Sequence, residues 1–554
     1  MTKVKQPEQI WSEYDKMRSY NDSLDLIETV EKNQLFYLGK QWDGVNAPNI
    51  EKPVVNIIRQ SIDYYVSNTV SDDISVQVEI PEDASPDTQE AINYIVSTEI
   101  DKVLEMIKFK SKQRKFIRDC ALDGDAYNYF WFDTTKNTKA KYQGAINMEL
   151  IDNTNIGFGD PTEMDVQKQP YILIVQKLPT DIVKEMAEAN GKDPDEVKGD
   201  ADAYDQNEMN ANMQGDYTTL ITRLWRSNGT VHACKSTKDI FIKDDTDLLQ
   251  TLYPVSNMVW REKKNCYHGE SPITAVIPNQ IMINKYYMMT NEFLKKTAFP
   301  KTIYDKQKLP NGINNKVEAI GVQGNPNEAI ITSSPLVQMN DQANQYVQDL
   351  IDKTKESLGI YDVALGNARP ENTSAIIALQ KTASQPLELQ KMDYYQMIED
   401  SVRIILDIMS AYYGTRSIKI KHILMPDELL QIKQAQQMQI PVDPMNPTPA
   451  VPQGDEAGEI EMELEFDYAE LSPENLQLTI EVGASAYWSE IMQMQTIDNM
   501  YRAKIIPDPQ TFVEEMPNGI IRKKNILEAI KRKEAKDQQM AMQASALQAQ
   551  TPVL

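Results

Sequence analysis

The feature that most constrains the fold is a run of apolar residues over 374–413 that recurs at every third or fourth position. Its members are Ile376, Leu379, Ala383, Leu387, Tyr394, Ile398, Val402, Ile405, Met409 and Tyr412. This spacing predicts one helix, which at 1.5 Å per residue would be roughly 60 Å long. Pro386 lies inside the run, removes an amide and clashes with the preceding turn, so a kink is predicted there. The alternative is two shorter helices that meet at Pro386.

A polar loop precedes this helix. The stretch "LGNARPENTS" over 365–374 places small polar residues and an arginine before a helix N-terminus, where proteins often bind phosphate. A nucleotide-binding enzyme is therefore one interpretation. It requires a strand before the loop and a nearby lysine or metal-binding aspartate, whereas "VQDLIDKTKESLG" has a helical pattern and the loop contains no lysine. The chain also lacks the GxxxxGK[ST], GxGxxG, HExxH and GxSxG motifs.

Length and net charge limit the classes of protein to which the chain can belong. The 554 residues are 41% apolar, so large cores can form, and the length suggests about three or four domains. The 57 basic and 82 acidic residues give a net charge of −25, unlike conventional nucleic-acid binders, whose affinity comes from a basic face. No signal peptide and no apolar run of membrane-spanning length is seen, so we expect the chain to be cytoplasmic when made.

The few cysteines and histidines limit catalytic and metal chemistry. Cys120, Cys234 and Cys266 are far apart, so neither a disulfide framework nor a CxxC metal site is predicted. His268 follows Cys266 by two residues, which could suggest a catalytic pair, but neighbours in sequence rarely face each other. We expect no catalytic residue, no cofactor and no metal, and a structural or assembly role rather than an enzyme.

The rest of the chain mixes helical and strand patterns, which predicts an α+β fold. Helices are expected over 8–38, 86–110, 273–297 and 342–358, the last ended by Gly359 as a C-cap. Asn228-Gly229 between apolar runs predicts a tight hairpin. The segments "IEMELEF" and "LQLTIEVGA" are expected to pair as strands. An acidic insertion near 192–216 and a Pro-rich linker at 440–458 interrupt these patterns.

The order of these parts resembles the portal proteins of tailed bacteriophages, most closely those of short-tailed phages. Three stretches carry the resemblance: "NQLFYLGKQWD" in an aromatic entry helix, "DNTNIGFGDP" in a strand-rich region, and "YHGESPITAVIPNQIMINKYYMMTN" before a punctuated module. A return helix, the polar loop and the long helix then follow. The resemblance rests on the order of the modules over most of the chain and not on any single motif.

The resemblance implies a mainly helical, multi-domain α+β fold that assembles into a ring, typically dodecameric, around a DNA channel. Its expected parts are N-terminal helices and a strand-rich wing (1–265), a stem helix (266–298), a clip (299–341), a stem return helix (342–358), a tunnel loop (359–373), a long kinked wing helix (374–414), wing and crown (415–520), and a C-terminal crown or barrel helix with a tail (521–554).

The resemblance also implies which residues meet other molecules. The tunnel-loop residues Gly366, Asn367, Arg369, Glu371 and Asn372 would face passing DNA. Arg369 could contact phosphates briefly, or could instead pair with Glu371 or with a neighbouring subunit. The candidate clip contacts with terminase are Lys301, Tyr304, Lys306, Lys308, Asn311 and Lys316.

The implied partners are those of a capsid vertex. They are further copies of the chain, the major capsid protein, the scaffolding protein, terminase, head-completion and tail adaptor proteins, and double-stranded DNA that passes without sequence specificity; no membrane is implied. The subunit would be made in the host cytoplasm and end in the virion. An acidic channel would bind duplex weakly, which lets DNA move in both directions. Another head–tail adaptor or structural virion protein and, less favoured, a nucleotide-binding enzyme are the alternatives.

Overall fold

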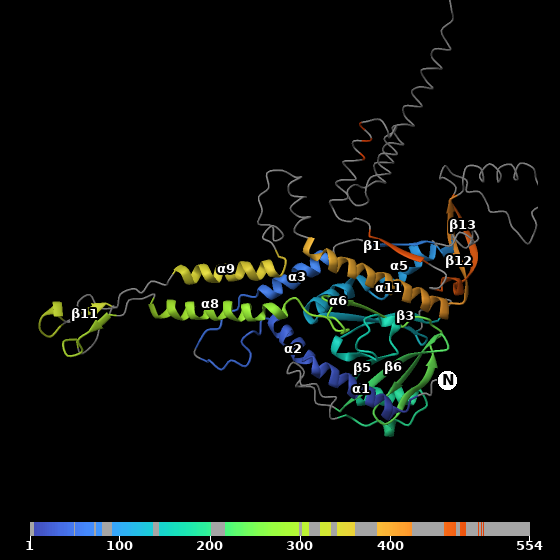
Figure 1. The fold of residues 1–554 in the computed structure, drawn as a ribbon, viewed down its shortest axis with the longest axis horizontal. Coiled ribbons are helices and arrows are strands. Elements are labelled where there is room, and N and C mark those ends of the chain that lie inside the picture. Colours follow the sequence, from blue (N-terminus) through green and yellow to red (C-terminus); the bar gives the residue numbers. More distant parts are fainter. Residues whose placement is uncertain are drawn as a thin grey trace, which may run out of the picture. The chain divides into compact units, whose positions relative to one another are not determined.

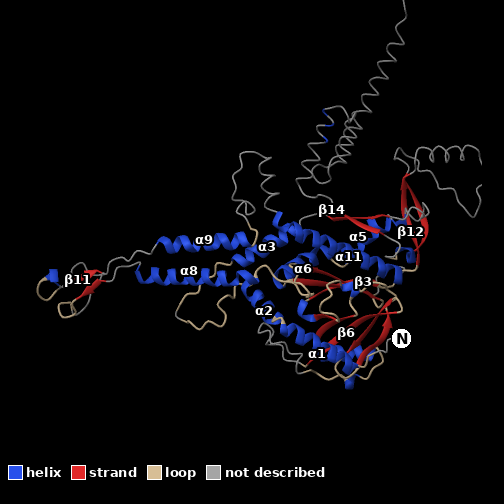
Figure 2. Ribbon diagram, viewed as in Figure 1, coloured by secondary structure: helices blue, strands red, loops and turns tan. Residues whose placement is uncertain are grey.

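The computed structural model describes residues 5–48, 50–70, 74–79, 91–92, 94–136, 143–200, 216–297, 302–309, 322–328, 330–333, 341–360, 385–423, 459–472, 477–482, and 497, 500 and 502. Helices and strands are both present (Figures 1 and 2). The chain divides into two units. The larger is Met1–Val70 with Gln77–Thr479, and the smaller is Ser71–Val76 with Ile480–Leu554. Strands β1 (Ile74–Glu79) and β14 (Gln477–Val482) each include residues of both units.

The largest sheet among the described residues has five strands and is antiparallel. In spatial order its strands are β4 (Ile156–Phe158), β5 (Tyr171–Pro179), β6 (Tyr217–Ser227), β7 (Thr230–Ser236) and β8 (Phe241–Asp247). The turn between β6 and β7 has φ of 56° at Asn228 and 92° at Gly229. Positive φ at both turn residues is the geometry that Asn-Gly favours, and the predicted hairpin is confirmed.

A three-stranded sheet packs face to face against the five-stranded sheet. Its order is β3 (Ala145–Ile151), β2 (Asp125–Asp133) and β9 (Val255–Val259). Side chains alternate between the faces of a strand. Ile172 and Ile174 of β5 therefore join Tyr127 of β2 in the core between the sheets, while Leu173 and Val175 point to the other face.

Helices cover the outer faces of both sheets (Figure 1). On the five-stranded sheet, α1 (Pro7–Ser23) packs Ile10, Trp11, Tyr14 and Met17 against Leu173 and Val175. On the three-stranded sheet, α11 (Glu388–Tyr412) places the Ser401 hydroxyl 2.8 Å from that of Ser256. The two sheets with α1, α7 (Thr180–Ala189) and α11 are called the body below.

Further helices of the larger unit show where sequence periodicity was misleading. They are α2 (Leu26–Tyr37), α3 (Ile57–Thr69), a π-helical turn (Ile95–Glu99), α5 (Ile100–Met106) and α6 (Phe109–Asp123). The single helix predicted over 8–38 is wrong, because Asp25 has a φ of 49° and separates α1 from α2. The break lets α1 lie on the sheet while α2 packs against α6. Lys108, with a φ of 55°, likewise separates α5 from α6.

Strand pairing after α11 also differs from the expectation. Strand β12 (Thr415–Ile423) pairs with β13 (Glu459–Asp467), from Thr415 opposite Asp467 to Ile423 opposite Glu459. The predicted pairing of β13 with the segment at 476–484 is therefore wrong. Short 3-10 turns complete the described elements: Asn153–Asn155, Val166–Lys168, Pro194–Glu196, Thr274–Val276, Pro326–Glu328, Gln385–Leu387 and Tyr468–Leu471.

Candidate functional site: a helix pair and a buried acidic centre

Two long helices, α8 (Ile277–Thr297) and α9 (Asp341–Ser357), form an antiparallel pair, called the arm below (Figure 2). Pro278 is the second residue of α8, where the missing amide costs nothing. The Asn279 amide donates to the Thr354 hydroxyl at 3.1 Å, and the Tyr286 hydroxyl bonds Asn344 further along. Between these contacts, Ile283 packs with Val347 and Ile351.

Buried amide side chains attach the root of α8 to the chain before α3. Gln280 donates to the Val55 carbonyl at 2.6 Å and accepts from the Ile57 amide at 3.1 Å. One turn later, the Asn284 side-chain oxygen accepts from the Val55 amide at 3.1 Å. The Tyr65 hydroxyl of α3 donates to the Leu358 carbonyl, at 2.6 Å, just past the end of α9. Both helices are therefore held at their roots by directional bonds.

Several apolar side chains of the arm face solvent. On α8, Met282 is 51% exposed, Met289 65% and Leu294 53%, and Tyr346 of α9 is 57% exposed. Apolar residues on a helix normally gather on one buried face. Here Ile283 is buried on one side of α8 while Met289 and Leu294 lie open. Met282 and Met289 are seven residues apart and share one face of α8, so part of this apolar surface faces solvent along one side of the helix.

A small β module lies between the two helices in the sequence. Strands β10 (Thr302–Tyr304) and β11 (Ile330–Ser333) pair antiparallel. Of the predicted clip contacts, Tyr304 and Lys306 are exposed, and Lys308 forms an ion pair with Glu328 at 2.6 Å. The other three, Lys301, Asn311 and Lys316, lie outside the described residues.

The predicted tunnel loop lies almost wholly outside the described part of the chain. This applies to Gly366, Asn367, Arg369, Glu371 and Asn372. Just before it, Gly359 has a φ of 70°, and the Ile360 amide bonds the Lys355 carbonyl at 3.0 Å. This confirms the predicted glycine C-cap of α9.

Pro386 lies in the 3-10 turn Gln385–Leu387, immediately before α11 begins at Glu388. Residues 361–384 are outside the description, so the kink of a longer helix stays a prediction.

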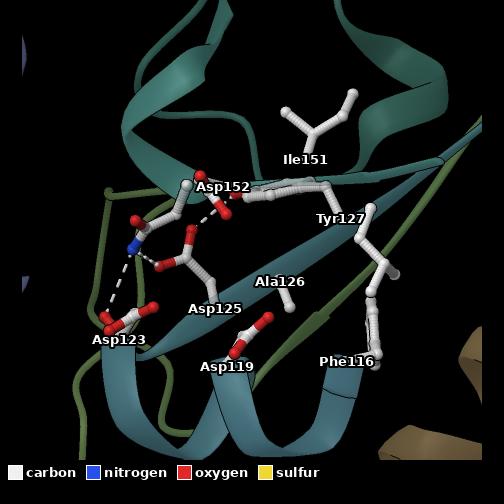
Figure 3. A pocket seen from close by; sticks show the side chains of 10 residues that line it. Phe116, Asp119, Asp123, Asp125, Ala126, Tyr127, Ile151 and Asp152 are labelled. Atoms are coloured by element: carbon white, nitrogen blue, oxygen red, sulfur yellow. Dashed lines mark hydrogen bonds between the residues drawn. The ribbon is translucent and has the colours of Figure 1, made fainter. Parts of the chain in front are cut away.

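A buried acidic centre lies where β2 begins (Figure 3). Asp125 and His268 are both fully buried, and the Nδ1 of His268 lies 2.8 Å from the Asp125 carboxylate. The carboxylate also accepts from the Tyr127 hydroxyl at 2.7 Å and from Asn153 at 3.0 Å. Burial raises the pKa of Asp125, but His268 and these hydrogen bonds outweigh burial and leave the pKa below its usual value.

The sequence neighbours Cys266 and His268 do not form a pair with each other. The Cys266 sulfur is 3.1 Å from the Tyr20 hydroxyl, whereas the second ring nitrogen of His268 faces Asn21 at 3.2 Å. Both contacts reach α1, and the Asp125 contact reaches β2. One buried hydrogen-bonded group, called the lock below, therefore links α1, β2 and the loop at 266–268. Its members are Asn21, Asp125, Tyr127, Asn153 and His268. No local pattern could have indicated it, because Asp125 and His268 are 143 residues apart.

A cavity of about 10 Å³, room for about one water, adjoins this lock. Asp119, Asp123 and Asp152 line it together with Asp125 (Figure 3). Burial raises the pKa of Asp119 and raises that of Asp123 well above its ordinary value. Gln34 donates to Asp123, and Arg118 bonds Asp119 at 2.7 Å. No group of three or more residues suited to hold a metal occurs among the described residues.

The described part of the chain contains no helix both long and apolar enough to cross a membrane. A scan of protein-family models finds no match to the chain, and a search of curated proteins finds no relative.

Proposed function

We propose that the chain is the subunit of a phage portal, the ring at one capsid vertex through which DNA enters and leaves. The observation that carries this proposal is the arm: two antiparallel helices, rooted on α3 and the chain before it, with a short β module between them in the chain. In this reading α8 and α9 are the stem, the β10–β11 module belongs to the clip, and α11 is the described part of the wing helix.

The exposed apolar residues of the arm support an assembly role. A ring forms when one surface of a subunit binds a different surface of the next and the rotation closes. Met282, Met289 and Leu294 would then be covered by a neighbouring copy, which removes their apolar surface from water. The net charge of −25 per chain supports a channel that does not bind duplex DNA tightly.

The other partners follow from the same proposal. The clip would meet terminase during packaging and adaptor proteins afterwards, through exposed groups such as Tyr304 and Lys306. The polar loop with Arg369 would face passing DNA. The body would contact the major capsid protein and the scaffolding protein, and no catalysis is assigned to the chain.

Assembly of the purified full chain tests the proposal. We expect negative-stain images of closed rings, typically dodecameric, with a channel wide enough for duplex DNA, and a matching mass in mass photometry. The double variant Met289→Asp/Leu294→Asp should shift the chain to monomers. Ile182→Asp is the matched control, because Ile182 is 45% exposed on α7 of the body.

Two results would contradict this assignment, and a third would contradict the role of the arm in it. Monomers alone across a range of salt concentrations would argue against any ring. Open tubes or filaments would favour another structural virion protein. Rings that persist in the double variant would show that the arm does not form the interface.

A further inference from the structure

The body contains a cavity of about 250 Å³ between its two sheets, next to the C-terminal end of α11. Side chains from both sheets and from α11 line it, among them Tyr129, Trp131, Lys235, Lys243, Gln250 and Tyr412. Glu149 and Lys243 are exposed while Gln250 is buried, so the cavity runs from the surface into the space between the sheets. The volume is slightly below the range for drug-sized ligands, which suits a ligand of one or two rings.

Lys235 is an unexpected residue at this position. It lies on β7, and alternation along the strand places it on the same face as Val231 and Ala233, which join the core between the sheets. An inner face normally carries apolar side chains, because burying a charge is costly. Burial lowers the pKa of Lys235, and Lys243 lowers it further.

The charges around Lys235 are only partly balanced by the protein, because Lys243 lowers the pKa of Lys235 more than Glu149 raises it. Lys243 is its direct partner on β8, so two like charges face each other across the strands. Among the described residues, no carboxylate lies within 4.0 Å of the ammonium group of either lysine. Glu149 is the nearby carboxylate, and it accepts a hydrogen bond from Gln176 at 3.2 Å. An anion in the cavity would relieve the repulsion between the lysines.

A second observation concerns Gln250. Its side chain is 2% exposed, and its side-chain oxygen has no hydrogen-bond partner among the described residues. A buried acceptor without a donor is rare and costs stability. Because Gln250 lines the same cavity, a ligand with an O–H or N–H group could supply the missing donor.

The walls of the cavity are flat and aromatic. The Tyr129 and Trp131 rings stack at 5.4 Å with an angle of 22° between their planes. Such walls favour a planar ligand that can stack on them.

We propose that this cavity binds a small planar aromatic acid that carries an O–H or N–H donor. The carboxylate lies against Lys235 and Lys243, the ring lies along the aromatic walls, and the donor bonds Gln250. The proposal concerns the body alone and does not depend on ring assembly.

Calorimetric titration of the full chain at pH 7 with three matched probes tests the site. The probes are 6-hydroxy-2-naphthoate, 2-naphthoate, which lacks the donor, and 2-naphthol, which lacks the charge. We expect saturable binding of one hydroxynaphthoate per chain, at least about fivefold tighter than either other probe. Lys235→Met should weaken both acids at least tenfold and change 2-naphthol less than twofold, while Lys264→Met, at an exposed lysine outside the cavity lining, should leave all three unchanged.

Gln250→Leu tests the hydrogen bond of the proposal separately from the charge interaction with the lysines. It should lower the affinity for 6-hydroxy-2-naphthoate to that for 2-naphthoate and leave 2-naphthoate unchanged. If Lys235→Met does not fold, Lys243→Met at the exposed rim carries the same expectation. The proposal is overturned if neither acid binds saturably at millimolar concentration, if 2-naphthol binds as well as the acids, or if the folded lysine variant binds them normally.

Discussion

The body buries most of its apolar side chains, whereas the arm leaves several of its apolar side chains exposed. In the body, Tyr127, Ile172 and Leu224 are fully buried between two sheets that cover each other. In the arm, Ile283 is fully buried but Met289, on the same helix, is 65% exposed. The body therefore carries its own stabilising core, whereas the arm is anchored at its root and leaves apolar surface beyond the root uncovered. The difference teaches that the residues that form the stabilising core are separate from those that leave apolar surface uncovered.

The largest effect should come from the buried lock of the body. Asp125→Asn removes the carboxylate that faces His268 and accepts from Tyr127 and Asn153, and each buried group left without its partner costs about 1–3 kcal/mol in the free energy of unfolding. Urea unfolding at pH 7 measures it. The control is Glu356→Gln in the exposed Lys353–Glu356 pair of the arm, which should change little. Equal losses in both variants would mean that burial does not distinguish the two regions.

Two substitutions on α8 test the contrast within the arm itself. Ile283→Ala should lower the free energy of unfolding by about 2–5 kcal/mol, because it opens a cavity against Val347 and Ile351. Met289→Ala should change it by less than about 0.5 kcal/mol, since its side chain is mostly in water. Unfolding must be followed at dilutions where the chain is monomeric. A large loss in Met289→Ala would show that α8 is covered by the chain itself.

An effect of opposite sign should come from Asp123. Burial raises its pKa above the ordinary 3.8, so the folded state binds a proton that the unfolded state has released. Stability therefore falls as pH rises from the ordinary pKa through the folded one. Asp123→Asn should increase the free energy of unfolding at pH 7, and the increase should disappear below about pH 3.8.

Urea titrations from pH 3 to 8 test this, with Asp239→Asn at an exposed turn as the control. The parent chain and the Asp123→Asn variant both keep the neighbouring acids Asp119, Asp125 and Asp152. The titration of these three acids therefore contributes to the pH dependence of both. A destabilised variant at pH 7 would show that the hydrogen bond from Gln34 outweighs burial.

Local chemistry explains which parts of the fold were predictable. The Asn228-Gly229 hairpin and the Gly359 cap follow from positive φ at single residues, which short stretches of sequence encode. The break at Asp25 was missed, because the apolar spacing continues across it and packing against different partners ends α1 there. Strand β13 was paired with its neighbour in sequence, whereas its actual partner β12 precedes it across a long segment.

The candidate sites also divide into features that local sequence predicts and features that depend on distant contacts. His268 was considered beside Cys266, but its charged partner is Asp125, and no spacing rule connects residues so far apart. Lys235 was predictable in part, because "VHACKS" alternates and places it on the face of Val231. Its pairing with Lys243 needs the register of β7 and β8, which includes a bulge that the sequence does not reveal. Clip candidates such as Tyr304 were named only through a resemblance.

The three cysteines have a practical consequence for distance measurements. Cys120, Cys234 and Cys266 are all buried, and burial raises the pKa of Cys234 to about 12, so its thiol stays protonated and unreactive. A single cysteine introduced at Met289 would be the thiol that a hydrophilic maleimide reaches first. In the ring proposed above, dyes or cross-linkers attached there would report the spacing between arms of different subunits without removal of the native cysteines.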